Sequence, residues 1–506
     1  MLKKFLVCAL GMASVAGAAP RKPKLILAIV VDQFRYDYLT RFRSDYNAGL
    51  ARLLTRGAVF TDANYDAFPT VTAVGHSTFL TGATPALSGI IGNDWFDREE
   101  GREVTSVSDP QTREVGGRGG AGASPRRLLV STVGDELKIS NGGQSRVIGV
   151  SLKDRSAILP AGHMANGAYW FDTGSAGFVT STFYEGELPA WVKAFNDGHP
   201  AARYAGATWL NHKMPADAKQ LSGALAASPF GNELVEAFAE QAIQAEQLGQ
   251  HGVTDILAVS FSSNDYVGHQ VGPDAPEVRE MSRRTDQVLG KLFEAADRAA
   301  GADNVMVVFT ADHGVAPLPE VNAARRMPGG RPPAGVFNQI VEQALTKKYG
   351  EGKWIVSSSE HSLYFNQALI ADKKLDRAEV ERTAADAART IPHVFRVYTR
   401  EQLMHGAVTE DSISRRVSNG FYASRSGDVE ILLEPYWIFT PSGATHGTAF
   451  GYDTHVPVIF LGPGVREGRY YRSITPNDIA PTLAAMLDVE TPSGSAGRVL
   501  AEMFAE

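Results

Sequence analysis

Aspartate and histidine residues recur directly after apolar segments of this chain, and together they could bind metal ions. Asp265 and His269 are four residues apart, so a single helical turn can direct the carboxylate and the imidazole at one ion. Asp312 and His313 are adjacent, and their side chains can converge only where the backbone bends, which Gly314 permits. Mixed Asp and His ligands without cysteine suit zinc, and suit manganese or iron less well. The spacing therefore predicts a metal centre.

Two further residues fit the same pattern. Asp32 follows the apolar segment 25–31, and His446 precedes Gly447 late in the chain. Any one of these side chains could instead be a helix cap or the partner of a buried hydrogen bond. Six of them in comparable positions favour a set of ligands over six independent structural roles.

A metal site of this kind needs a nucleophile, and the hydroxyl-rich segment 68–76 offers one. Its sequence, FPTVTAVGH, precedes the helix-like residues 77–80. At a helix N-terminus, free backbone N–H groups and the helix dipole favour a phosphate anion. Coordination to a cation also lowers the pKa of a hydroxyl enough to make it a nucleophile. Taken alone, Thr72 could equally be an N-cap.

The elements that must position these residues are short, continuous apolar segments. They span residues 25–31, 256–261, 305–310 and 456–461. Runs of this length predict strands that are buried on both faces of a parallel sheet. Residues 277–300 carry one apolar stripe, which predicts a covering helix. We therefore expect an α/β fold whose central, mostly parallel sheet has helices on both faces and binds ligands beyond the carboxyl ends of its strands.

Two segments rich in Gly, Pro and Arg interrupt this alternation. Residues 115–127 and 323–334 predict exposed loops. We expect them to mark two insertions over the active-site face, at about residues 99–221 and about residues 323–436, the second with a helix near residues 376–390. No linker separates independent domains, so residues 19–506 are expected to form one catalytic domain.

The segment 68–76 resembles the nucleophile region of the alkaline phosphatase superfamily, together with Thr81-Gly82 and the sequence GIIGN at residues 89–93. The similarity is greatest to bacterial alkaline phosphatases with a threonine nucleophile and to the related nucleotide pyrophosphatase/phosphodiesterases. It implies an alkaline-phosphatase-like fold. It also implies that Thr72, four residues before His76, is the nucleophile and that Asn93 contacts a phosphoryl oxygen.

The resemblance further implies two zinc ions. One would be held by Asp32, Thr72, Asp312 and His313, and the other by Asp265, His269 and His446. The third, magnesium site of the serine-type enzymes has no recognisable ligands in this sequence, and Lys153 is a candidate to replace its charge. His76 and His455 fall outside the ligand set and are expected to be structural.

A further segment, SLKDR at residues 151–155, resembles the Lys-x-Arg segment of the threonine-type phosphomonoesterases. In that family the lysine and the arginine bind the non-bridging oxygens of a dianionic phosphate. A monoester carries one more negative charge than a diester, and two additional cations stabilise that charge. Lys153 and Arg155 therefore favour a phosphate monoester hydrolase, an alkaline phosphatase that acts through a phosphothreonine intermediate.

Two alternatives stay open. A phosphodiesterase or nucleotide pyrophosphatase would use the same metals and Thr72, although Lys153 and Arg155 argue against it. An inactive phosphate-binding protein would be expected to have lost Thr72 or a metal ligand, and none is missing. A serine hydrolase is disfavoured because the sequence has no Gly-x-Ser-x-Gly elbow.

Composition and the first residues bear on location and partners. The formal net charge of −7, without a long Lys/Arg run, gives no electrostatic footprint for nucleic acid. Residues 1–18 have the layout of a secretory signal peptide, and the single cysteine, Cys8, lies inside that segment. We expect a periplasmic or secreted monomer without a stable membrane anchor, acting on small phosphate monoesters.

Overall fold

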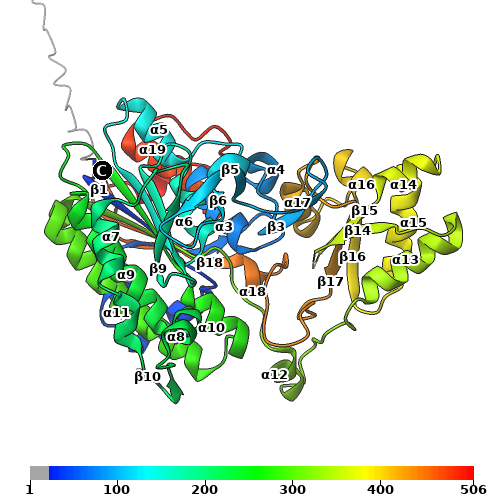
Figure 1. Ribbon diagram of the computed structural model, residues 1–506, viewed down its shortest axis with the longest axis horizontal. Helices are drawn as coiled ribbons and strands as arrows, with labels where there is room; N and C mark the ends of the chain where they lie inside the picture. Colours follow the sequence, from blue (N-terminus) through cyan, green and yellow to red (C-terminus); the bar gives the residue numbers. More distant parts are fainter. Residues whose placement is uncertain (1–21, 360, 506) are drawn as a thin grey trace, which may run out of the picture.

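The computed structural model describes residues 22–359 and 361–505 of the 506-residue chain. The predicted signal peptide, residues 1–18, lies outside the described residues. The chain forms a large lobe around an 11-stranded sheet and a small lobe, residues 336–433, around a four-stranded sheet (Figure 1).

The five strands at the centre of the 11-stranded sheet are parallel. In spatial order they are β13 (Val305–Thr310), β1 (Leu25–Val31), β12 (Asp255–Phe261), β7 (Val147–Ser151) and β8 (Gly167–Asp172). The outer strands add mainly antiparallel pairs, with β18 (His455–Leu461), β2 (Ala58–Asn64) and β19 (Gly468–Tyr470) beyond β13, and β9 (Gly177–Ser181), β5 (Ser108–Val115) and β6 (Ala121–Ala123) beyond β8. The predicted α/β fold is therefore confirmed, and three of the four predicted buried strands, β1, β12 and β13, are parallel. The fourth, β18, is antiparallel to β13, so the expectation of a parallel strand at residues 456–461 was wrong.

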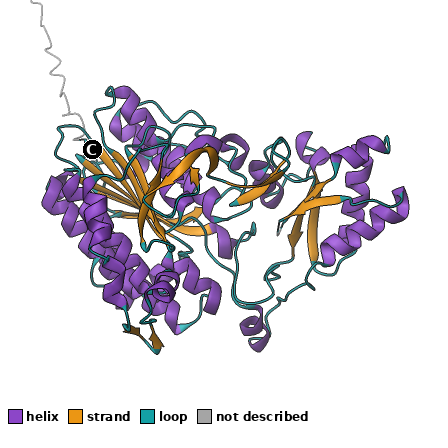
Figure 2. Cartoon of the chain, viewed as in Figure 1, coloured by secondary structure: helices purple, strands orange, loops and turns teal. Residues whose placement is uncertain are grey.

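Helices cover both faces of this sheet because successive residues of the central strands point to opposite sides. Leu27 and Ile29 of β1 belong to one core, with α2 (Gly49–Arg56), α9 (Pro229–Ala245) and α11 (Pro276–Ala300). Ala28 and Val30 belong to a second core, with α3 (Thr72–Thr81), α5 (Val133–Ser140) and α19 (Ile479–Leu487). Figure 2 shows the two helical layers on either side of the strands.

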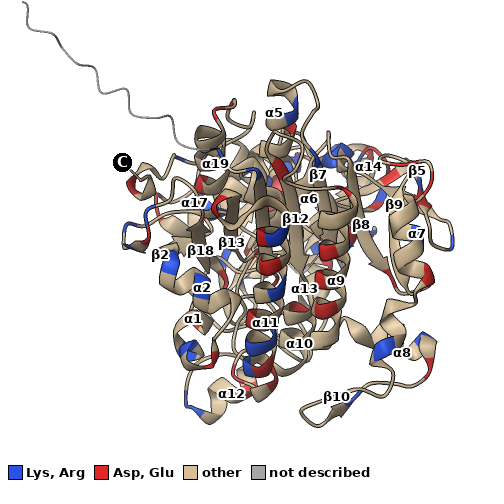
Figure 3. Ribbon diagram, turned by 90° about the vertical axis from the view of Figure 1, so that its left-hand side faces the viewer, with Lys and Arg blue, Asp and Glu red and all other residues tan. Residues whose placement is uncertain are grey.

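The helix predicted for residues 277–300 is α11. Its apolar stripe is buried against the sheet, from Val278 at one end to Phe293 near the other. Its outer surface carries charges of both signs (Figure 3), among them an ion pair of 3.1 Å between Arg284 and Glu280. This side of the helix therefore faces solvent, as the period of its apolar residues requires.

The small lobe has its own hydrophobic core. Its antiparallel sheet has the order β14 (Ile355–Ser358), β15 (Ser362–Phe365), β17 (Val429–Leu433) and β16 (Val394–Thr399), packed with α13 (Val336–Tyr349) and α15 (Arg377–Arg389). Shorter helices are α14 (Gln367–Asp372), α16 (Arg400–Met404) and α17 (Ser412–Gly420). This lobe falls within the second predicted insertion, whose helix near residues 376–390 is α15.

The first predicted insertion, about residues 99–221, contains more than surface elements. Strands β7, β8 and β9 lie within it and are strands of the central sheet. Its remaining parts include β4 (Arg102–Thr105), which pairs with β3 (Asp94–Asp97), then α6 (Asp154–Ala161), α7 (Ala190–Asp197), α8 (Ala218–Leu225) and the hairpin of β10 (Thr208–Trp209) and β11 (His212–Lys213). Elsewhere lie α1 (Tyr38–Arg41), α4 (Pro85–Ser88), α10 (Ser263–Val271), α12 (Pro319–Ala324) and α18 (Gly451–Thr454). The division into one catalytic domain with two insertions stays a prediction.

Candidate active site

Four neighbouring parallel strands bring the predicted site residues to one edge of the sheet. In spatial order, β13 is followed by Asp312 and His313, β1 by Asp32, β12 by Asp265 and β7 by Lys153. Because the carboxyl ends of parallel strands meet at the same edge, residues separated by up to 281 positions in the sequence become neighbours.

The first candidate metal group consists of Asp32, Asp312 and His313, all fully buried. His313 Nε2 lies 3.4 Å from Asp32 Oδ1 and 3.4 Å from Asp312 Oδ2. None of these three atoms has a hydrogen-bond partner among the described residues. Burial of unpaired polar atoms is costly, so the group suits a cation that all three atoms can ligate.

The second candidate group consists of Asp265, His269 and His446. Asp265 Oδ1 lies 3.1 Å from His269 Nε2 and 3.6 Å from His446 Nε2. The Asp265 and His269 pair lies on α10, one turn apart, as their spacing predicts. His446 comes from the segment before α18, far along the chain.

All three histidines of the two groups are oriented in the same way. The Nδ1 atoms of His269, His313 and His446 lie 2.7, 2.9 and 2.8 Å from the carbonyl oxygens of Ala444, Gly314 and Thr70. An Nδ1–H group that donates to a carbonyl leaves Nε2 with its lone pair directed into the site. This is the arrangement that metal-ligating histidines usually have.

The protonation of His313 and His446 also fits metal binding, whereas the Asp265 carboxylate outweighs burial and raises the pKa of His269 to about 9. Burial lowers the pKa of His313 to about 3, and burial with the neighbouring His313 ring lowers the pKa of His446 well below its usual value. Both imidazoles are therefore neutral, which is the form that binds a metal. Burial and the Asp32 carboxylate raise the pKa of Asp312. A bound cation would offset that repulsion.

Thr72 is the first residue of α3 and is buried. The N-cap position is held by Val71 in an extended conformation, so Thr72 is not the N-cap. The Asn93 side chain performs the capping function instead, since its Oδ1 accepts a hydrogen bond of 2.9 Å from the backbone N–H of Ala73. Asn93 is thereby fixed next to Thr72, and its amide group remains as a donor.

Helix α3 and the residues just before it contact both metal groups. Gly75 packs so closely on Asp312 that a Cβ atom there would lie 2.3 Å from the Asp312 carbonyl oxygen. On the other side, the Thr70 carbonyl accepts the hydrogen bond from His446. Residues on both sides of Thr72 therefore contact the metal groups, one group each.

His76 and His455 belong to neither group. His76 Nδ1 lies 2.8 Å from the Thr72 carbonyl oxygen and its Nε2 lies 2.7 Å from Ser260 Oγ. His455 Nε2 lies 3.0 Å from the Thr61 carbonyl oxygen. Both rings thus bind protein groups, and His76 Nδ1 also lies 3.3 Å from Asp312 Oδ2 of the first metal group.

Lys153 lies between the two metal groups. Its Nζ is 2.6 Å from Asp32 Oδ2 and 2.7 Å from Asp265 Oδ2. Burial opposes its charge, but attraction to Asp265 and Asp32 outweighs burial and raises the pKa of Lys153. Arg155 lies on α6, one position beyond Asp154, and its side chain keeps 26% of its surface exposed. Of the two cations, Arg155 is therefore the one more open to solvent, while Lys153 pairs with the carboxylates of Asp32 and Asp265.

Gln33 is a residue that our sequence reasoning missed. Its backbone N–H donates to Asp312 Oδ1 at 3.0 Å, and its side-chain Nε2 donates to Asp265 Oδ1 at 2.7 Å. It thereby connects the two metal groups. Its φ of 59° is unusual for a residue other than glycine. Its position directly after Asp32 was the available signal, but the turn that directs it inward is not visible in the sequence.

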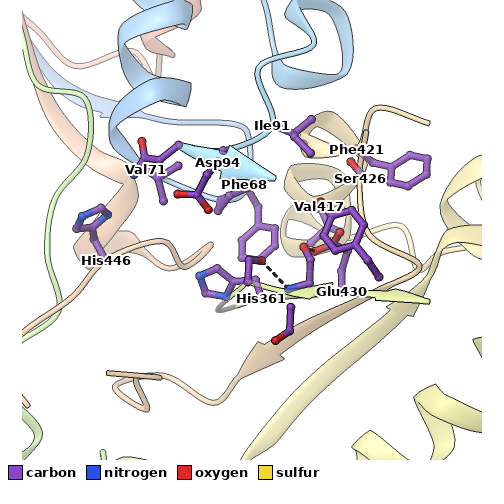
Figure 4. A pocket seen from close by; sticks show the side chains of 18 of the residues that line it. Phe68, Val71, Ile91, Asp94, His361, Val417, Phe421, Ser426, Glu430 and His446 are labelled. Atoms are coloured by element: carbon purple, nitrogen blue, oxygen red, sulfur yellow. Dashed lines mark hydrogen bonds between the residues drawn. The ribbon is translucent and has the colours of Figure 1, made fainter. Parts of the chain in front are cut away.

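A pocket of about 470 Å³ opens beside these groups, and we call it the interlobe pocket (Figure 4). Its large-lobe side includes Asn93, His269 and His446, so it is continuous with the candidate active site. Its small-lobe side includes Tyr364 and Glu430. The small lobe therefore forms one wall of the site.

Comparison with known proteins places the chain in a family. Residues 26–453 match the family described as type I phosphodiesterase / nucleotide pyrophosphatase. The chain belongs to this family. Alkaline phosphatase PafA of Elizabethkingia meningoseptica is 34% identical to it over 99% of each chain. Alkaline phosphatase PhoV of Synechococcus elongatus is 38% identical over 96% of this chain and 93% of its own length.

Solved structures agree with this assignment. The crystal structure of wild-type PafA superposes on this chain with a TM-score of 0.89, covering 96% of this chain and all of the PafA chain, at 34% identity. A second PafA structure carries substitutions of a threonine, an asparagine, a lysine and an arginine. The predicted family, its alkaline-phosphatase-like fold and an enzyme of the alkaline phosphatase type are therefore confirmed.

Proposed function

We propose that this chain is a secreted, zinc-dependent phosphate monoester hydrolase that works through a phosphothreonine at Thr72. The observation that carries the proposal is that Thr72 is the first residue of α3, with Gly75 packed on Asp312 of one candidate metal group and Thr70 bonded to His446 of the other. Backbone N–H groups at a helix N-terminus favour the phosphate anion that must approach this hydroxyl.

We assign one zinc ion to Asp32, Thr72, Asp312 and His313, and a second to Asp265, His269 and His446. The unpaired buried atoms of the first group and the inward Nε2 atoms of all three histidines support this assignment. Carboxylate and imidazole ligands without thiolates suit Zn²⁺. When bound, two such ions supply Lewis-acid stabilisation of the attacking and leaving oxygens.

We assign the remaining steps of the reaction to four residues of the chain. Thr72 Oγ1 attacks phosphorus, and the ester oxygen opposite to it leaves. The Asn93 amide, fixed by its bond to Ala73, donates to a non-bridging oxygen. Arg155, whose side chain is partly exposed, pairs with the second negative charge of a monoester. Lys153 balances the carboxylates of Asp32 and Asp265 and adds positive charge beside the phosphoryl group.

The substrate class is supported by the relatives. PafA and PhoV are named alkaline phosphatases, and a PafA mutant was solved with changes to the four residue types that we assign here to Thr72, Asn93, Lys153 and Arg155. The family description also includes phosphodiesterases, so diester hydrolysis is the alternative that a test must separate. An inactive phosphate-binding protein is disfavoured because every assigned residue is present.

We also propose export through residues 1–18 and a monomeric state for the mature enzyme. In the described part of the chain, no helix is both long enough and apolar enough to cross a membrane. The proposed domain, residues 19–506, would then act outside the cytoplasm as a single catalytic unit.

The test compares an aryl phosphate monoester with its methyl diester, each with chelator and after zinc is added back. The proposal expects zinc-dependent turnover with a strong preference for the monoester. Preference for the diester would support the phosphodiesterase instead, and full activity in chelator would contradict the zinc assignment. Phosphate binding without turnover of either ester would favour the inactive binding protein.

A further inference from the structure

The interlobe pocket is large enough to hold more than a phosphoryl group. Its volume of about 470 Å³ is within the range of small-molecule sites. It is lined by Asn93 and by His269 and His446 of the second metal group. Of the metal ligands, only residues of this second group line it. The pocket therefore adjoins the second metal group, and only one end of a substrate held between Thr72 and this group can enter it.

The part of the substrate that enters the pocket is its leaving group, given the proposed function on which this inference rests. In an in-line displacement the leaving oxygen lies opposite the attacking Thr72 hydroxyl. The first metal group is on the Thr72 side, so the leaving oxygen is on the side of His269 and His446. The organic group attached to that oxygen then lies against the small lobe.

The charges that face this organic group are negative. Two carboxylates line the pocket, Asp94 from β3 and Glu430 from β17, and none of the described lining residues is lysine or arginine. Figure 4 shows Asp94 near Val71 on the catalytic side and Glu430 across the pocket, below Val417. A leaving group with a second phosphate or a carboxylate would meet these carboxylates without a cation of the pocket wall to pair with.

The Glu430 carboxylate has a fixed position in the pocket wall and carries a negative charge in alkaline solution. It is only 8% exposed, and its Oε2 accepts a hydrogen bond of 2.6 Å from Ser362 Oγ on the neighbouring strand. The positive charge of Arg98 favours the ionised form of Glu430, while the Arg98 guanidinium pairs with Asp428 at 3.2 Å. Burial raises the pKa of Glu430 to about 7, so the carboxyl is ionised in alkaline solution.

The other walls suit an organic cation. Aromatic rings of Phe68, Tyr364 and Phe421 line the pocket. The faces of such rings attract ammonium groups, and carboxylates accept their N–H bonds. Phe68 is also fixed by the His361 ring, whose centroid is 5.0 Å away in an edge-to-face arrangement.

We propose that the interlobe pocket is a leaving-group subsite in which Asp94 and Glu430 select phosphate monoesters of amino alcohols over monoesters whose leaving group carries a second anion. The selection acts on the leaving group alone. It is therefore separate from the distinction between monoesters and diesters, which we assign to Lys153 and Arg155.

The experiment measures kcat/KM at alkaline pH for three alkyl phosphates of similar size. They are phosphoethanolamine with a cationic leaving group, glycerol 1-phosphate with a neutral one and phosphoglycolate with an anionic one. The expected order is cationic, neutral, anionic. Glu430→Gln and Asp94→Asn keep the shape of each side chain, and each should reduce the ratio of cationic to anionic ester by about 10-fold. Asp94→Lys, at an exposed position, should favour the anionic ester.

Glu294→Gln is the matched control, since Glu294 is 74% exposed on α11, away from the pocket, and its variant should keep the wild-type ratio. Turnover of glycerol 1-phosphate normalises each variant for folding and zinc content. An unchanged ratio in Glu430→Gln, Asp94→Asn and Asp94→Lys, with that ester still hydrolysed, would overturn the subsite and leave the proposed function intact. Failure of the wild-type enzyme to hydrolyse any of the three esters would overturn the proposed function and the subsite together.

Discussion

One buried carboxylate of the small lobe and two at the edge of the large sheet have opposite hydrogen-bonding patterns. In the small lobe, Asp428 is fully buried and its Oδ2 accepts a hydrogen bond of 2.7 Å from the Phe365 N–H, while its Oδ1 pairs with Arg98 and Arg377. At the edge of the large sheet, Asp32 Oδ1 and Asp312 Oδ2 are equally buried, yet have no hydrogen-bond partner within the described residues. The first arrangement stabilises a fold, and the second suits an added cation.

This contrast separates Asp32 and Asp312 from Asp428, but it does not extend to Asp265, whose oxygens accept hydrogen bonds from Gln33 and Lys153. The same rule applies to the histidines. His76 and His455 bond to protein groups, whereas His313 Nε2 has no such partner and is directed at two carboxylates. The residues that a fold leaves unsatisfied at a strand end are the ones to test for function.

The largest effect is expected for Thr72→Ala. Without its hydroxyl the enzyme has no nucleophile, and kcat for an aryl phosphate should fall by about four powers of ten or more. Zinc content and phosphate binding should persist, because the other ligands remain. Thr72→Ser is the matched control, since it retains a hydroxyl at the same position and should keep measurable turnover. Near wild-type kcat in Thr72→Ala would show that Thr72 is not the nucleophile.

A matched pair of aspartates tests the comparison itself. Asp312→Asn removes a ligand charge. The free energy of zinc binding should weaken by about 3 kcal/mol, which is about one quarter of the binding free energy of a four-ligand site. Asp428→Asn breaks a buried ion pair, so the free energy of unfolding should drop by about 3 kcal/mol.

Zinc titration and denaturant unfolding of both variants measure the two effects. The comparison requires that zinc affinity is unchanged in Asp428→Asn. If the two variants lost zinc affinity equally, the distinction between the lobes would be wrong.

Specificity for monoesters is expected to change by a similar or larger amount. Each charge-assisted hydrogen bond contributes about 1.5–3 kcal/mol. Replacing both Lys153 and Arg155 by Ala should therefore lower kcat/KM for a monoester by about two to four powers of ten. The methyl diester should lose far less. The ratio of the two activities is the quantity to measure, because Lys153 also bridges Asp32 and Asp265 and its loss affects both substrates. Equal losses would mean that the pair is structural.

The smallest effect concerns Gln33. Removing its amide should weaken metal binding by about 10–100-fold, the usual effect of losing a partner of a metal ligand. Gln33→Gly isolates the side chain, because glycine adopts the φ of 59° without strain. Isothermal titration of zinc into this variant measures the change, and wild-type affinity would show that the side-chain contact to Asp265 does not position this residue.

The sequence predicted the parts of the site that depend on strand ends. Asp32, Asp265 and the Asp312-His313 pair each follow an apolar run, and parallel strands bring such positions together whatever their distance in the sequence. The covering helix α11 was predictable for a similar reason, since its apolar period fixes which face is buried.

Other features depend on geometry that no local pattern contains. Gln33 turns toward the metal groups only through a positive φ. Lys153 contacts two carboxylates that follow the neighbouring strands β1 and β12. The sequence did not predict that β7, β8 and β9 belong to the central sheet, because the segments around them are rich in loops. Glu430 reaches the pocket only because the small lobe packs there, which is a tertiary effect.

The central claim is that the phosphoryl group is transferred first to Thr72, and the stereochemistry at phosphorus tests it without any substitution. The measurement follows an isotopically chiral phosphoryl group from an aryl ester to an acceptor alcohol on the zinc-loaded enzyme. Each in-line displacement inverts phosphorus, so two successive steps through a covalent intermediate predict overall retention. Overall inversion would mean a single direct displacement and would contradict the phosphothreonine mechanism.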